Sequence, residues 1–246
     1  VIQKGDVVLD IGANIGYYAL LWSKFVGPEG IVYALEPVSA NFAILEKNIR
    51  LNNAMNIHTY KLAAGSTNGT QTINIYNQRN LSSFVTGDRE DYKKLLTGTE
   101  KVQMITVDDF LKDKRTPKLV RMDVEGYEGE ILKGMRGSLD TIPYLLIELH
   151  PNLMNKEQKK DMYNLLIEKG FVWGLVFYEH LKWFNKKGKI KSIIKFVDKE
   201  LGEEQCQIKE ITSESALQDL FKEREESPNV FFSKVPLPNV LRNIAF

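Results

Sequence analysis

Short apolar runs and amphipathic stretches alternate along the chain. Val7–Ile11 and Ile31–Leu35 are continuous runs of mostly aliphatic and β-branched residues, typical of strands buried on both faces of a parallel sheet. Between such runs, apolar residues recur every three or four positions, which is the spacing of a helix that buries one side. This alternation predicts an α/β fold with helices on both faces of the sheet.

The predicted elements follow one another with few interruptions. The first helix should end at Gly27-Pro28 and bury an apolar stripe of Tyr18, Leu21, Trp22 and Phe25. A second helix should start with Ser39 as its cap and run to Asn52-Asn53. Further strands are expected at 57–64, 118–123, 144–151, 171–178 and 229–233, with a helix at 156–169.

Two stretches depart from this pattern. Residues 66 to about 107 include alternating polar and apolar positions, which predicts antiparallel strands inserted over the carboxyl edge of the sheet. Residues 179–228 form a late insertion, and its segment 180–191 mixes aromatic residues with cations. We therefore expect a single domain over residues 1–246, with its core at 1–178 and 229–235.

Composition narrows the classes of function. The 246 residues are 43% hydrophobic and 26% charged, as in a soluble globular protein, and the net charge of +1 gives no sign of nucleic-acid binding. The sequence has no apolar run of membrane-spanning length, and Cys206 is its only cysteine, so we expect a cytoplasmic protein. The late cations favour a solvated hairpin over weak contact with an anionic carrier or a membrane surface.

The first strand ends in a carboxylate and a glycine turn. Asp10 is followed by Gly12, Ala13, Asn14 and Gly16, and two glycines four apart let the backbone approach a bound ligand. The pyrophosphate of a dinucleotide would lie unfavourably close to Asp10, whereas S-adenosylmethionine brings an ammonium and a sulfonium. We therefore expect S-adenosylmethionine, with Asp10 at its ammonium group; the alternative is an ordinary strand-to-helix turn.

The ends of the next two strands also carry side chains that suit S-adenosylmethionine. Glu36 ends the second strand, where an acidic side chain accepts hydrogen bonds from ribose hydroxyls, and Pro37 follows it. Ala63 and Ala64 end the third strand, and such small side chains leave room for an adenine ring. The alternatives are a solvated strand end at Glu36 and a simple turn at the two alanines.

A central strand later in the chain also ends in a carboxylate. Asp123 should lie at the same edge of the sheet as the first two acids, while Glu125 should turn away with the backbone. Glu128 and Glu130 open a helix, where acidic side chains complement the helix dipole. That helix should bury Ile131, Leu132 and Met135.

The fifth strand adds another pair of polar residues. Glu148 and His150 are two positions apart, so their side chains should point to the same side of an extended chain. An unperturbed histidine titrates near neutral pH, so His150 could accept a proton from a substrate hydroxyl. A structural hydrogen-bonding role for His150 is an equal alternative.

Together these motifs resemble those of the FkbM-type methyltransferases. The matching segments keep the order and spacing of that family over residues 6 to about 151: Asp10–Gly16, Glu36-Pro37, Ser82-Ser83, 107–111, Asp123–Glu128 and 147–150. The resemblance implies a Rossmann-like, seven-stranded class I methyltransferase sheet and S-adenosylmethionine-dependent O-methylation of sugars, polyketides or related hydroxyl compounds. It also implies an acceptor mouth near Asp123 and Glu148, where we place Ser82, Ser83 and Glu125 as acceptor-binding residues.

The predicted reaction is methyl transfer to a hydroxyl of a small molecule or glycan, with S-adenosylhomocysteine as product. Asp123 and His150 are the candidate bases, and Glu148 should orient His150 or the acceptor. We predict no metal, although these three residues could together ligate a divalent ion. The alternatives are a catalytically inactive cofactor-binding module and, less consistent with Asp10, a nicotinamide-dependent oxidoreductase.

Overall fold

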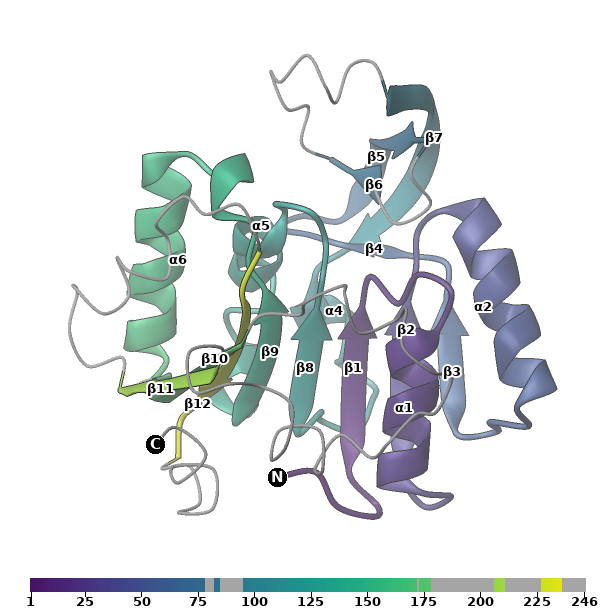
Figure 1. Cartoon of the computed structure of the whole chain (residues 1–246), viewed down its shortest axis with the longest axis horizontal. Coiled ribbons are helices and arrows are strands. Elements are labelled where there is room, and N and C mark those ends of the chain that lie inside the picture. The colour runs from purple at the N-terminus through teal and green to yellow at the C-terminus, as the bar shows by residue number, and fades with distance from the viewer. Residues whose placement is uncertain (78–81, 85–94, 172, 178–205, 211–226, 236–246) are drawn as a thin grey trace.

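A computed structural model describes residues 1–77, 82–84, 95–171, 173–177, 206–210 and 227–235 of the chain. Its main sheet has the strand order β11-β10-β12-β9-β8-β1-β2-β3 (Figure 1). The five strands from β9 to β3 are parallel, and β12 runs antiparallel to both β9 and β10. The strands are β1 (Val7–Ile11), β2 (Ile31–Leu35), β3 (Ile57–Tyr60), β8 (Leu119–Met122), β9 (Tyr144–Glu148), β10 (Trp173–Phe177), β11 (Cys206–Glu210) and β12 (Asn229–Ser233).

This architecture confirms the predicted α/β fold and adds one strand to the seven expected. The eighth strand, β11, pairs with β10 at the edge of the sheet and falls in the stretch predicted as a late insertion. The cation-rich segment 180–191 of that insertion lies outside the described residues. None of the helices in the described ranges combines the length and the apolar character needed to cross a membrane.

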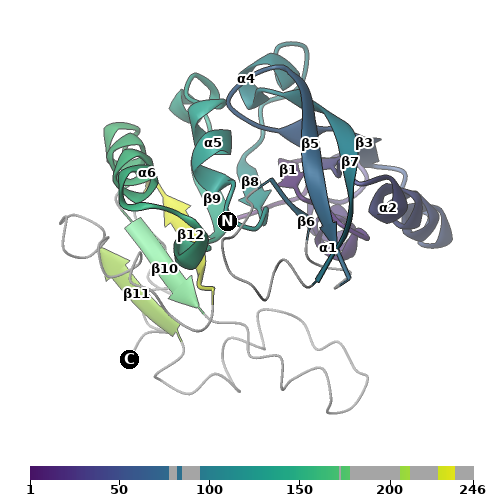
Figure 2. The ribbon, with the colours of Figure 1, turned by 90° about the horizontal axis from the view of Figure 1, so that it is seen from above.

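Helices cover both faces of the main sheet (Figure 2). Helices α1 (Tyr17–Val26) and α2 (Ser39–Leu51) pack on one face, and the other carries α4 (Val107–Phe110), α5 (Glu128–Lys133) and α6 (Lys156–Glu168). Along β1, Leu9 and Ile11 join the core under α5 and α6, whereas Val8 joins the core under α1 and α2. Because strand side chains alternate, Asp10 belongs to the same face as Val8.

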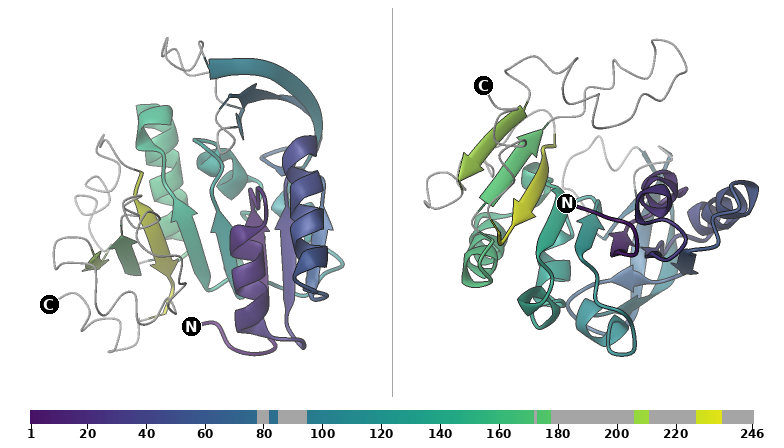
Figure 3. Two further views of the ribbon diagram at one scale, coloured as in Figure 1. Left: turned by 45° about the vertical axis from the view of Figure 1, so that its right-hand side comes forward. Right: turned by 90° about the horizontal axis from the view of Figure 1, so that it is seen from below.

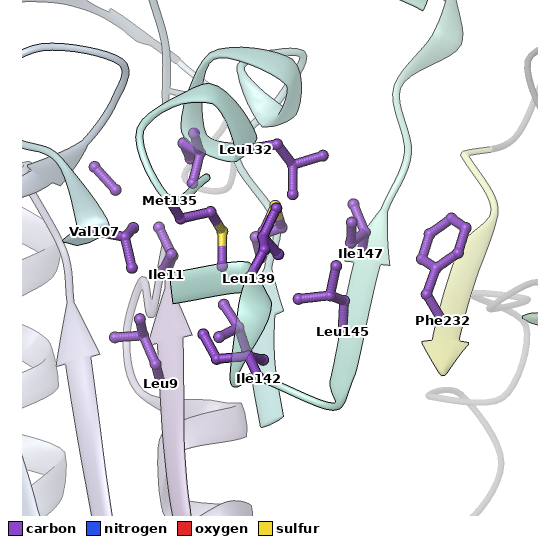
Figure 4. Close-up of a cluster of buried hydrophobic side chains, with 14 of the residues drawn as sticks. Leu9, Ile11, Val107, Leu132, Met135, Leu139, Ile142, Leu145, Ile147 and Phe232 are labelled. Atoms are coloured by element: carbon purple, nitrogen blue, oxygen red, sulfur yellow. The ribbon is translucent and has the colours of Figure 1, made fainter. Parts of the chain in front are cut away.

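The larger core lies between the sheet and α4–α6 (Figure 4). Ile131, Leu132 and Met135 are buried in it, as the helical spacing predicts. Short 3-10 turns at Ser138–Asp140 and Pro151–Leu153 place further apolar residues there. This packing fixes the carboxyl ends of β8 and β9, because Met122 and Ile147 are part of the core.

A second sheet of four strands stands over the carboxyl edge of the main sheet (Figures 1 and 3). Its order is β4-β7-β5-β6, from β4 (Ala63–Ala64), β7 (Leu96–Ile105), β5 (Gly69–Tyr76) and β6 (Ser82–Ser83). The predicted insertion over this edge is therefore present as an antiparallel hairpin, β5–β7, with a short strand on either side.

Four predicted element details are wrong. The strand expected at 144–151 ends at Glu148, and a 3-10 turn begins at Pro151. The third strand does not run to residue 64: β3 ends at Tyr60, the chain turns, and Ala63–Ala64 pair with β7 instead. Helix α2 begins at Ser39 itself, which donates to Glu100, rather than using it as a cap. The strands expected between residue 66 and about 107 end at Ile105, because the Thr106 side chain accepts from the backbone N–H of Asp109 and caps α4.

The buried stripe of α1 is also different from the one predicted. Its buried residues are Ala19, Ser23 and Val26, and small side chains there let the helix approach the sheet closely. The aromatic residues are only partly buried: Trp22 packs against the same core, and its ring stacks with that of Tyr18 at a centroid distance of 6.5 Å.

Candidate functional site

A cavity opens between the carboxyl ends of β1, β2 and β8 and the underside of the second sheet. It measures about 610 Å³, part of it open to solvent. Predicted site residues that line it are Gly12, Asn14, Glu36, Pro37, Ala63, Ala64, Ser82, Asp123 and Glu125. Asp10, Ala13 and Gly16 lie behind this lining, and Glu148 and His150 border it through Asp123 and Glu125.

The turn after β1 has a conformation that requires glycine. Gly12 has φ +77°, and a Cβ there would collide with the backbone carbonyl of Asp123. The N–H groups of Gly12 and Ala13 donate to the carbonyl of Leu35, at 3.0 and 2.9 Å, which ties the turn to the end of β2. Gly16 has φ +92° and packs against Leu45 of α2. The turn therefore brings bare backbone to the cavity wall.

The Glu36 carboxylate is fixed by backbone donors. Its two oxygens accept from the N–H groups of Val38 and Asn14, both at 2.9 Å, and the residue is 4% exposed. Burial raises the pKa of Glu36 to about 7, although these N–H groups favour the charged form. A carboxylate oxygen can accept more than one hydrogen bond, so Glu36 still has the capacity to bind ribose hydroxyls.

Arg121, a residue that was not among the predicted site residues, lies next to Asp10. The Nη1 group of Arg121 lies 3.3 Å from Oδ1 of Asp10 and 3.2 Å from the Gly12 carbonyl, and Nη2 lies 2.7 Å from Oδ2 of Asp123. Burial raises the pKa of Asp10, against the effect of this guanidinium. The alternation of side chains along a strand could have indicated this position, because Arg121 precedes Asp123 by two residues. In the sheet Arg121 pairs directly with Asp10.

Two buried oxygen atoms of the turn have no hydrogen-bond partner among the described residues. They are Oδ2 of Asp10, a residue that is fully buried, and Oδ1 of Asn14. A buried polar atom without a partner is costly, so each is a place where a bound ligand can supply the missing donor. The carboxylate suits an ammonium group, and the amide oxygen suits a hydroxyl or an amine.

His150 is held between carboxylates. Its Nδ1 lies 2.7 Å from Oε1 of Glu128, a fully buried side chain that also accepts from the N–H of Gly126. Its Nε2 lies 3.3 Å from Glu125 and 3.8 Å from Glu148. Glu128, expected only to complement a helix dipole, is therefore the residue that orients the ring, in place of Glu148.

The carboxylates around the ring decide its charge. Burial alone would lower the pKa of His150, but Glu128 and Glu125 raise it to about 10, so the ring is a cation at neutral pH. Burial raises the pKa of Glu125 to about 7. Burial and the neighbouring Asp123 also raise the pKa of Glu148.

Glu125 and Ser83 do not lie as expected. Glu125 has φ +52°, which turns its side chain back toward His150 rather than away from the site. Ser83 is buried, and its hydroxyl donates to the carbonyl of Glu125 at 2.7 Å, so it supports this conformation. Ser82, half-buried, lies on the cavity wall.

One group in the described part of the chain has the residue types of a metal site. Ligand atoms of Asp123, Glu148 and His150 all lie within 4.8 Å of one another. Oxygen and imidazole ligands of this kind suit a divalent cation. A protonated ring cannot ligate, however, so the raised pKa of His150 disfavours this use at neutral pH.

The sheet order, with the antiparallel β12 between β9 and β10, is that of the class I methyltransferase fold. The structure resembles that of methyltransferase FkbM from Methylobacillus flagellatus with a TM-score of 0.50 at 19% identity, over 71% of this chain and 40% of that one. A model of the methyltransferase FkbM domain matches residues 10–173. The chain therefore belongs to the FkbM methyltransferase domain family, and S-adenosylmethionine is its cofactor.

Two relatives share most of this region. The hexuronic acid methyltransferase AglP of Haloferax volcanii is 27% identical over 169 residues, which cover 68% of this chain and 63% of that protein. Methyltransferase 1 of Beauveria bassiana is 26% identical over 159 residues, which cover 58% of this chain and 64% of that protein. The chain thus spans less than two thirds of either relative.

Proposed function

We propose that this domain transfers a methyl group from S-adenosylmethionine to a hydroxyl oxygen of a sugar or related glycan acceptor. The observation that carries the proposal is the group of carboxylates around His150 at the edge of the cofactor cavity. Methylation of a hydroxyl releases a proton, and this group offers a place for it. The name of the relative AglP supports a sugar acceptor.

The residues around the glycine turn fit the cofactor. Asp10 would accept from the ammonium group through its unpartnered Oδ2, and Glu36 would accept from the ribose hydroxyls. Ala63 and Ala64, both 3% exposed, leave the wall beside them flat enough for adenine. When bound, S-adenosylmethionine supplies an electrophilic methyl group on a sulfonium.

Glu148 is the better candidate for the proton acceptor. A base works best when its pKa is near the working pH, and burial together with Asp123 shifts the pKa of Glu148 upward in that direction. His150 is already protonated and stabilises the negative charge of its neighbours. With S-adenosylmethionine bound, the hydroxyl oxygen would take the methyl group from its sulfonium, which would be left as a neutral thioether, and the hydroxyl proton would pass to a carboxylate oxygen of Glu148.

The test is a screen of acceptors with methyl-labelled S-adenosylmethionine. The panel contains uronic-acid oligosaccharides, glycolipids and polyketides, and each labelled product is treated with mild alkali. We expect label in a sugar-containing acceptor, bound as an ether that survives alkali. Label released by alkali would mean a methyl ester, which would overturn the hydroxyl assignment.

Two variants separate a working enzyme from an inactive binding module. Glu148→Gln should lower kcat by about 100-fold or more while leaving the affinity for S-adenosylmethionine nearly unchanged. The exposed carboxylate Glu168, which pairs with Arg136, provides the matched control Glu168→Gln, and it should keep full activity. Cofactor binding without label transfer to any acceptor would identify the domain as an inactive module.

A further inference from the structure

Arg121 occupies the space between the glycine turn and the two strand-end aspartates. Its guanidinium contacts Asp10, the Gly12 carbonyl and Asp123, and the residue is 5% exposed. Its Cζ lies 4.3 Å from the centre of the Tyr18 ring of α1. These contacts fix the position of the Arg121 side chain. It lies next to Asp123, which lines the cavity.

The negative charges of the cavity wall would repel the carboxylate of the cofactor. The methionine end of S-adenosylmethionine carries a carboxylate as well as an ammonium group. The described residues that line the cavity include the acids Glu36, Asp123 and Glu125 and neither Lys nor Arg. A ligand carboxylate in this wall would be repelled unless a cation lay directly behind it.

The position of the ammonium group restricts where a cation that binds the ligand carboxylate can lie. In an α-amino acid the ammonium and the carboxylate are attached to the same carbon atom, so their binding partners in the protein must be neighbours. The unpartnered atom that suits the ammonium is Oδ2 of Asp10, and Arg121 contacts the other oxygen of the same carboxylate at 3.3 Å. Arg121 is thus a cation at the right distance from the ammonium position.

We propose that the guanidinium of Arg121 binds the methionine carboxylate of S-adenosylmethionine. The proposal rests on the binding of this cofactor in the cavity, and it is independent of the acceptor. A guanidinium carries five N–H donors in a planar fork, so it can hold Asp123 and a ligand carboxylate at the same time. Asp10 and Arg121 then present opposite charges to the two charged groups of the amino acid.

A purely structural ion pair is the competing explanation for Arg121. In that case the residue would neutralise two buried aspartates, and its loss would destabilise the fold and weaken all ligands of the cavity alike. A carboxylate-binding residue would instead discriminate between ligands that differ in this one group. The experiment therefore compares ligands as well as variants.

The ligand pair is S-adenosylmethionine and its decarboxylated form, which keeps the sulfonium and the ammonium group. Calorimetry on the wild-type chain should show that the decarboxylated ligand binds about 10- to 100-fold more weakly, as expected for losing hydrogen bonds between charged groups. In Arg121→Met this difference should fall to less than about threefold. Arg121→Lys, which keeps the charge but not the fork, should show an intermediate difference.

Arg136→Met is the matched control, because Arg136 is an exposed arginine paired with Glu168. It should keep the wild-type difference between the two ligands. If Arg121→Met does not fold, the wild-type chain and Arg121→Lys still decide the question. Equal affinities of the two ligands for the wild-type chain would overturn the proposal, as would an unchanged difference in Arg121→Met. If S-adenosylmethionine itself failed to bind the wild-type chain, the proposed function would fail instead.

Discussion

The ion pair between Glu128 and His150 makes the stability of the domain depend on pH. Replacing Glu128 by Gln keeps the size of the side chain and an oxygen that can accept from Gly126 and from Nδ1 of the ring. It removes the charge that contributes most to raising the pKa of His150. The variant therefore tests the electrostatic origin of the raised pKa without creating a cavity.

The size of the effect follows from the two pKa values of His150. Its ordinary pKa is 6.5, and in the folded protein the pKa is about 10. A group whose pKa is raised by folding adds stability that is complete below pH 6.5 and is lost as the pH rises through 10. At about 1.4 kcal/mol per pH unit, this difference corresponds to about 5 kcal/mol of unfolding free energy. Glu128→Gln should remove about half of it or more.

The assay is chemical unfolding at a series of pH values from 6 to 10, combined with an NMR titration of the ring. The unfolding free energy of the wild type should decrease across this range, and that of Glu128→Gln should decrease much less. Glu130→Gln is a matched control on the same helix and should keep the wild-type slope. The chain has three histidines, so His150→Gln assigns the resonance. A ring that titrates near 6.5 in the wild type would refute the reasoning.

Three further predictions concern cofactor binding and the candidate metal site. Gly12→Ala should abolish S-adenosylmethionine binding by calorimetry and lower stability by about 1–3 kcal/mol or more, because a Cβ meets the carbonyl of Asp123 at a positive φ; wild-type binding would contradict this. Glu36→Gln should weaken the cofactor about tenfold or more, since an amide cannot accept both backbone N–H groups; unchanged affinity would remove its ribose role. Exhaustive chelation should leave methyl transfer intact, and a loss that Mn²⁺ restores would show that the group around His150 binds a metal.

The sheet and its strand-end acids were predictable because their signals are local. Strands buried on both faces are continuous apolar runs, and β1, β2 and β12 lie where those runs predict them. Parallel strands end at the same edge, so Asp10, Glu36 and Asp123 could be placed near one another without knowledge of the packing. The even-numbered positions of β1 share a face with the odd-numbered positions of β8, because Asp10 pairs with Arg121.

The contacts that decide the chemistry of the site were not predictable in the same way. Glu128 and His150 are 22 residues apart, and Asp10 and Arg121 are 111 residues apart. At a helix N-terminus, an acidic residue satisfies the dipole whether or not a histidine lies above it, so the pattern at Glu128 favours the simpler role. The prediction of the buried face of α1 was wrong for a related reason. Its aromatic residues also have helical spacing, and only the packing against the sheet shows that Ala19, Ser23 and Val26 are the buried residues.

The two cations of the site divide its carboxylates into two groups with different tasks. Arg121 contacts Asp10 and Asp123 beside the glycine turn, whereas His150 contacts Glu125 and Glu128 at the end of β9. If each cation acts only on its own carboxylates, a substitution in one group should leave the behaviour of the other group unchanged. Glu128→Gln should alter the pH dependence of stability but not the discrimination between S-adenosylmethionine and its decarboxylated form, and Arg121→Lys should do the reverse. Asp123 contacts Arg121 and also lies near His150, so a double variant should show additive effects only if Asp123 does not couple the two groups. Strong non-additivity would mean that Asp123 or Glu148 couples the two groups into one electrostatic unit.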